Sequence, residues 1–151
     1  MKRFIFSLEK VLEVKKIEEK TIQKHLLYIQ AKIYEVEKNI LSIDEKISQE
    51  RHNLSSLKSS KKNSNDIMVH YNYIESLSID KENLYIDLDN LKMTESNVRK
   101  KLVEKSKERK TLEKMKENRY IEYRKDYYQE QQKKYDEISI SNHRIRHGAT
   151  S

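Results

Sequence analysis

The sequence predicts an all-α protein in which two long helices form an antiparallel coiled-coil hairpin. The second helix is expected to be longer than the first and to end in a disordered C-terminal tail. The chain has no proline and one glycine, Gly148, so long uninterrupted helices are favoured. Apolar residues recur at alternating spacings of four and three, which stay in line only when a helix supercoils with a partner. Hydrophobic content of 35% and charged content of 38% suit a narrow seam between two helices.

The first helix is expected over residues 4–57, and Ser7 offers an N-cap for a slightly later start. Its seam keeps the four–three spacing without a break, and only Lys15, Glu19 and Glu50 in it are not apolar. The seam positions are Leu8, Leu12, Lys15, Glu19, Ile22, Leu26, Ile29, Ile33, Val36, Ile40, Ile43, Ile47, Glu50, Leu54 and Leu57.

A polar loop is predicted over 58–65, and Asp66 is a good N-cap for a second helix over 66–138. This helix carries a second seam of the same spacing: Ile67, His70, Ile74, Leu77, Lys81, Leu84, Leu88, Leu91, Glu95, Val98, Leu102, Lys105, Arg109 and Leu112. Two seams joined by a short polar stretch predict an antiparallel pair, in which facing residues have numbers that sum to about 124. Ile33 then faces Leu91, Leu8 lies near Lys116, and Glu19 is placed to pair with Lys105.

Past Lys116 the second helix has no partner in the first, yet this overhang is rich in large side chains: Tyr120, Ile121, Tyr123, Tyr127, Tyr128 and Tyr135. Aromatic residues are favoured at the cores of interfaces, and a lone solvated helix gains little from them. One interpretation packs them on Phe4, Ile5 and Phe6. The interpretation we favour is a protein-docking surface made of Phe4, Phe6, Tyr120, Tyr123 and Tyr127. Periodicity is lost after Ser139, so we expect one domain over 1–140 and a disordered tail over 141–151.

No catalytic constellation is recognisable, and we expect neither an enzyme nor a cofactor. The chain has no cysteine and its histidines are scattered. His143 and His147 have i, i+4 spacing but no carboxylate close by, so no metal site is expected. No stretch predicts a signal peptide or a membrane span. The net charge is +7, but basic residues surround the helix around 99–110 rather than forming one stripe, so no nucleic-acid partner is expected.

Three segments resemble the FliJ family of flagellar export proteins. Phe4-Ile-Phe-Ser-Leu-Glu-Lys-Val-Leu-Glu-Val-Lys-Lys-Ile-Glu-Glu19 is similar to the family's start, and Tyr71-Asn-Tyr-Ile-Glu-Ser-Leu77 to its aromatic–aliphatic helix start. Arg109-Lys-Thr-Leu-Glu-Lys-Met-Lys-Glu117, followed by Gln131-Gln-Lys-Lys-Tyr-Asp-Glu137, resembles its C-terminal signature. The resemblance covers residues 4–140, and the order and spacing of the segments carry it.

The resemblance implies a non-enzymatic central stalk of the flagellar type III export apparatus, cytoplasmic and peripherally associated with the inner membrane. Family members bind the hexameric export ATPase, contact the cytosolic domain of the export gate FlhA, and recycle export chaperones. Carried over by position, the gate contact falls on Asn39, Ile43, Lys46, Glu50, Tyr73, Leu77, Asp80 and Leu84. Lys46 and Glu50 depart from the aromatics of the family. We assign the gate contact to Ile43, Tyr73 and Leu77, and Tyr73 is the best single candidate because Ile43, Leu77 and Leu84 lie on the predicted seams.

Two alternatives remain open from the sequence. One is the homologous stalk of a virulence-type secretion system. The other is a structural coiled-coil tether or dimer without an ATPase partner, whereas the hairpin predicts a monomer when the chain is free.

Overall fold

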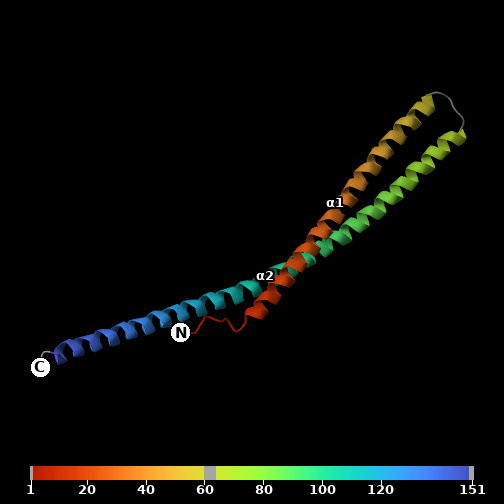
Figure 1. Cartoon of the computed structure of the whole chain (residues 1–151). Coiled ribbons are helices and arrows are strands. Elements are labelled where there is room, and N and C mark those ends of the chain that lie inside the picture. The colour runs from red at the N-terminus through yellow and green to blue at the C-terminus, as the bar shows by residue number, and fades with distance from the viewer. Residues whose placement is uncertain (1, 60–63, 150–151) are drawn as a thin grey trace. The chain divides into compact units, whose positions relative to one another are not determined.

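The computed structural model describes residues 2–59 and 64–149, and it forms two α-helices that pack against each other (Figure 1). Helix α1 spans Glu9–Ser59 and helix α2 spans Ser64–Gly148. The described residues contain no strand. The prediction of an all-α chain with a longer second helix is therefore confirmed.

The chain divides into two compact units. Unit 1 comprises Met1–Glu18 together with Lys105–Ser151, and unit 2 comprises Glu19–Glu104. Each unit thus contains a length of α1 and a length of α2. The predicted division into one domain over 1–140 remains a prediction.

In unit 2 the two helices run in opposite directions. His70 lies 2.6 Å from Glu50 through Nδ1, and Lys81, further along α2, pairs with Asp44, which lies earlier in α1. The core is aliphatic and comes from both helices: Ile29, Ile33, Ile40, Leu88 and Val98, with Ile22, Leu26, Val36, Leu84 and Leu91 packed against it. All of these are predicted seam positions, and every seam position of this unit is buried or partly buried. The four–three spacing therefore identifies the packed face of each helix.

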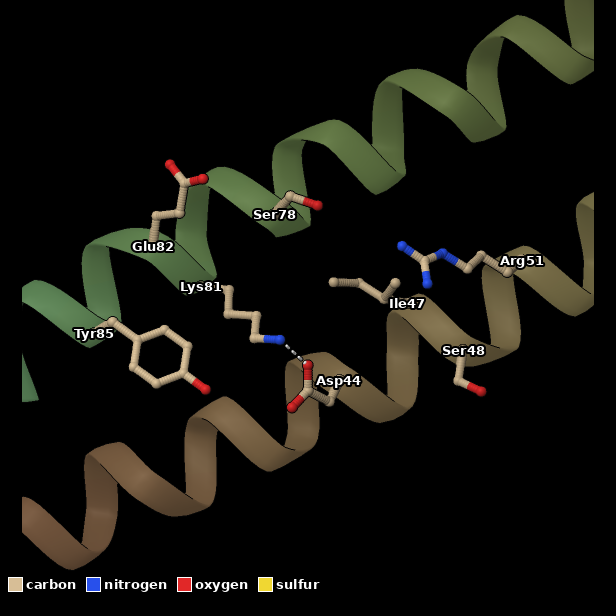
Figure 2. Close-up of a pocket in the computed structure, with 8 residues that line it drawn as sticks. All are labelled: Asp44, Ile47, Ser48, Arg51, Ser78, Lys81, Glu82 and Tyr85. Atoms are coloured by element: carbon tan, nitrogen blue, oxygen red, sulfur yellow. Dashed lines mark ion pairs between the residues drawn. The ribbon is translucent and has the colours of Figure 1, made fainter.

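Figure 2 shows how the two helices of unit 2 meet around Lys81. Lys81 and Tyr85 point from α2 toward α1, where Asp44 receives the lysine in an ion pair. Glu82 points from α2 away from α1. Lys81 and Glu82 are adjacent in α2, yet one lies on the packed face and the other on the outer face, as the helical period requires.

The start of α1 differs from the prediction. The helix begins at Glu9 and not near Phe4, because residues 2–6 leave the helical path and a turn follows at Ser7 and Leu8. The turn is closed by the amide of Glu9, which donates to the carbonyl of Phe6 at 3.1 Å. Both helices extend into the loop predicted over residues 58–65, since α1 ends at Ser59 and α2 begins at Ser64. Residues 60–63 lie outside the described residues.

The end of α2 also differs from the prediction. The helix continues to Gly148 and does not end near residue 138, so residues 141–148 are helical where a disordered tail was expected. Residues 150–151 lie outside the described part of the chain. Apolar periodicity indicates which residues are buried, and residues 132–149 are all exposed. The apolar seam can therefore end while the helix itself continues. No proline or glycine interrupts the helix before Gly148.

Candidate aromatic docking site

In unit 1 the non-helical segment 2–6 contacts α2 through the ring of Phe4 and the backbone of Lys2. The ring of Phe4 meets that of Tyr120 edge-on, with centroids 5.2 Å apart and planes at 68°. It also meets Tyr123 at 5.5 Å. The hydroxyl of Tyr123 donates a hydrogen bond to the backbone carbonyl of Lys2 at 3.0 Å. These contacts fix the N-terminal segment to the tyrosine-bearing stretch of α2.

The tyrosines form a ladder because they recur at spacings of three and four along one face of α2. Tyr120 and Tyr123 stack with centroids 6.4 Å apart, and Tyr123 and Tyr127 stack at 6.5 Å. We call Phe4, Tyr120, Tyr123 and Tyr127 the aromatic cluster. Their separations fall in the range of favourable aromatic pairs, so the rings hold one another in place.

Arg124 lies beside this ladder. Its guanidinium carbon is 6.0 Å from the centroid of the Tyr120 ring and 5.7 Å from that of Tyr128. The guanidinium also donates to the Tyr128 hydroxyl at 3.3 Å. The contact with Tyr128 is the main cause that raises the pKa of Arg124 above its ordinary value. The site therefore combines aromatic faces with a fixed positive charge.

Much of the aromatic cluster faces solvent. Tyr120 is 45% exposed and Tyr127 38% exposed, whereas Phe4 and Tyr123 are partly buried. Phe6, also predicted to dock a partner, is only 6% exposed, which suits packing within unit 1. An open hollow beside the cluster is lined by Phe4, Leu12, Lys16, Glu113, Lys116, Glu117 and Tyr120. Packing of the tyrosines on the N-terminus is thus observed for Phe4, while docking by the exposed faces stays a prediction.

Four alternating charges link α1 and α2 of unit 1. Lys15 Nζ lies 3.0 Å from Glu108, and Lys105 Nζ lies 3.1 Å from Glu18. The ammonium of Lys105 lowers the pKa of Glu18, and that of Lys15 lowers the pKa of Glu108. In turn Glu18 raises the pKa of Lys105. Sequence reasoning foresaw polar residues here but did not name Glu18 or Glu108; the i, i+3 pairs Lys15–Glu18 and Lys105–Glu108 were the signal that it missed. The pairing of Glu19 with Lys105 stays a prediction.

A further ion pair agrees with the predicted register of the two helices. Lys116 Nζ lies 2.7 Å from Glu9, next to Leu8, which was expected near Lys116. This ion pair also belongs to unit 1, and it lies at the start of α1, close to the aromatic cluster in sequence.

The three residues assigned to the export gate lie in unit 2. Leu77 is buried and Ile43 partly buried, both on the packed seam, whereas Tyr73 is exposed. Tyr73 is thus the one of the three with a large accessible side chain. The gate assignment stays a prediction.

In the described residues, no group of three histidine, cysteine, aspartate or glutamate side chains could hold a metal ion. The rings of His143 and His147 are 4.1 Å apart in an edge-on arrangement. Neither described helix has an apolar stretch long enough to cross a membrane.

Comparison with known proteins gives one result of wide coverage. The model of a family described as flagellar FliJ protein matches residues 4–148. No curated protein and no solved structure matches the chain. The family match spans nearly the whole length, including α1, α2 and the aromatic cluster, and the chain therefore belongs to the FliJ family of flagellar proteins.

Proposed function

We propose that this chain is a non-enzymatic central-stalk component of the flagellar type III export apparatus that binds the hexameric export ATPase. The observation that carries the proposal is the aromatic cluster, which keeps exposed tyrosine faces at the start of a stretch of α2 that is almost entirely exposed. From residue 124 to residue 149, Gln131 is the one described position that is not exposed. Tyrosines clustered in this way, beside the cation of Arg124, are typical of binding hot spots.

In this proposal unit 2 acts as a coiled-coil hairpin, and its aliphatic core supplies stiffness. A single chain presents different side chains at each angle around its axis, so it cannot contact six identical subunits equally. Binding would therefore favour some subunits over others. This bias promotes assembly of the ATPase and its activity.

The same stalk would link the ATPase to the export gate FlhA and to export chaperones. We assign the gate contact to the neighbourhood of Tyr73, the exposed residue of the three carried over from the family, with Ile43 and Leu77 holding the helices beneath it. Peripheral association with the inner-membrane apparatus follows from these contacts.

Replacement of the three tyrosines tests the ATPase proposal. The triple variant Tyr120→Ala, Tyr123→Ala, Tyr127→Ala should bind the cognate export ATPase at least about tenfold more weakly, since aromatic hot spots each contribute about 2 kcal/mol or more. Titration calorimetry and the steady-state ATPase rate measure the effect. Circular dichroism checks that helicity is unchanged.

The matched control uses exposed tyrosines of α1. Tyr28→Ala with Tyr34→Ala removes two rings that are also exposed but lie outside the aromatic cluster, and it should leave the affinity unchanged. Equal binding by the triple variant and the native chain would refute this docking site. Equal weakening by both sets of changes would refute its specificity.

A further inference from the structure

The outer face of α2 in unit 2 carries a second, exposed apolar stripe. Ile79, Ile86 and Met93 are seven residues apart and are 52%, 59% and 68% exposed. None of them is a seam position. A spacing of seven keeps side chains in line along a supercoiled helix, which is the pattern that a partner helix recognises. The stripe is bounded, because Asn72 and Lys100 occupy the next positions of the same spacing.

The two flanks of this stripe differ in charge. One flank is acidic, with Glu75, Glu82 and Asp89 again seven residues apart, and all three are exposed. The other flank is neutral, with Ser76, Asn83, Asn90 and Asn97. Figure 2 shows Glu82 directed away from α1, as a residue of the outer face should be.

This stretch is acidic within a basic chain. Residues 75–93 contain five carboxylates, Glu75, Asp80, Glu82, Asp87 and Asp89, and two cations, Lys81 and Lys92. Lys81 points toward α1 and is paired with Asp44, so it does not neutralise the outer face. The net charge of the whole chain is +7, so the negative charge of this stretch is opposite in sign to that of the chain.

We propose that the outer face of α2 from Glu75 to Met93 binds an amphipathic helix of a partner protein, whose apolar stripe is flanked by lysine or arginine. The heptad-spaced stripe selects a helix, and the acidic flank selects its charge. At about 1.5 Å per residue the stripe is roughly 21 Å long, so a partner helix of about four turns or more covers it. The proposal concerns unit 2 alone and does not depend on ATPase binding.

A second copy of this chain fits the surface less well. Another α2 packed antiparallel on this stripe would bring one acidic flank against the other, and like charges repel. The exposed stripe of α1, made of Leu27, Tyr34 and Leu41, has mixed flanks, with Glu37 and Asp44 on one side and Lys24 and Lys38 on the other, and its Asp44 is already paired with Lys81. A separate basic helix is thus the occupant that the charges favour.

Two helix-stabilised 21-residue peptides test this inference by charge exchange. Both carry leucine every seventh residue, with lysine along the flank in one peptide and glutamate in the other. Fluorescence anisotropy against the full chain should show the lysine peptide binding about tenfold more tightly, the sum of three exposed ion pairs. The variant Glu75→Lys, Glu82→Lys, Asp89→Lys should invert the order of the two peptides.

A second variant tests the apolar stripe. Ile79→Ser, Ile86→Ser, Met93→Ser should abolish binding of the lysine peptide. Its control, Ile121→Ser with Ile138→Ser, changes two comparably exposed apolar residues of α2 and should bind as the native chain does. Equal affinity for the two peptides, or no inversion by the lysine variant, would overturn the proposal. So would a chain that forms dimers by light scattering and loses them in the serine variant.

Discussion

Phe4 packs edge-on against Tyr120, with ring centroids 5.2 Å apart, although one residue precedes α1 and the other lies far along α2. This contact makes the N-terminal segment part of unit 1 and explains why α1 starts at Glu9. A helix that began near Phe4 would require helical backbone where segment 2–6 is not helical. The packing of one aromatic ring thus outweighs several residues of helix propensity, which is a weak preference for each residue.

Replacement of this ring should release the N-terminal segment. Phe4→Ala removes two aromatic contacts worth about 0.5–1.5 kcal/mol each, so amides of residues 3–8 should exchange with solvent several-fold faster. Hydrogen exchange measured by mass spectrometry detects the change. Ile5→Ala is the control, because Ile5 is exposed and its loss should leave exchange unchanged. Identical exchange in the two variants would mean that Phe4 does not hold the segment.

Adjacent residues of α1 should differ sharply in their effect on stability. Ile40 is buried in the core of unit 2, and Leu41 beside it is exposed. Ile40→Ala should lower the free energy of unfolding by about 2–4 kcal/mol, through lost burial and the cavity left behind. Leu41→Ala should change it by less than about 0.5 kcal/mol. Urea denaturation followed by circular dichroism measures both values, and similar losses for the two variants would contradict the assigned core face.

The packed faces were predictable from the sequence because a long pair of helices repeats the same four–three spacing of apolar residues along its length. Ile33, Ile40 and Leu88 stand at the predicted spacing and are buried. Even Glu19, a polar residue at a predicted seam position, is buried. Burial in such a pair depends on position along the repeat, which a single sequence displays in full.

Three features were not predictable in this way. The hydrogen bond from the Tyr123 hydroxyl to the backbone carbonyl of Lys2 joins residues far apart in the sequence. Because a backbone carbonyl accepts it, no pattern of side chains predicts it. The ion pair of Glu18 with Lys105 involves a residue beside the predicted seam, and the seam pattern does not say toward which side a long side chain leans. The last part of α2, up to Gly148, is fully exposed. An exposed helix and an exposed coil both lack a hydrophobic pattern, so the sequence does not distinguish them there.

The stability of unit 1 should depend on pH through Glu18 and Glu108. The pKa of each lies below the ordinary value of 4.5, because the ammonium groups of Lys105 and Lys15 favour the charged carboxylate. A carboxyl whose pKa is lower when folded stabilises the fold above its unfolded pKa, and this is lost as the pH falls through the folded pKa. Unit 1 should therefore weaken below about pH 4.5.

The double variant Glu18→Gln, Glu108→Gln isolates this effect. It should show a smaller loss of helicity than the native chain between neutral pH and acid, measured by thermal melts at low salt. Added salt should reduce the difference, because exposed ion pairs are screened. Parallel melting profiles of the two proteins across this pH range would show that the four charges make no pH-dependent contribution.

Paired cysteines should decide whether the two seams meet within one chain or between two chains. The chain has no native cysteine, so Ile33→Cys with Leu91→Cys introduces a single pair. Ile33 belongs to the buried core of unit 2, and Leu91 packs against it, so the two thiols should come within disulfide reach. The control pair, Ile33→Cys with Ile74→Cys, places the thiols more than two helical turns apart along the register. Oxidation at high dilution should give an intrachain disulfide in the first variant only, seen as a monomer of altered mobility on non-reducing gels. Disulfide-linked dimers in its place would support the alternative of two chains pairing as a structural tether.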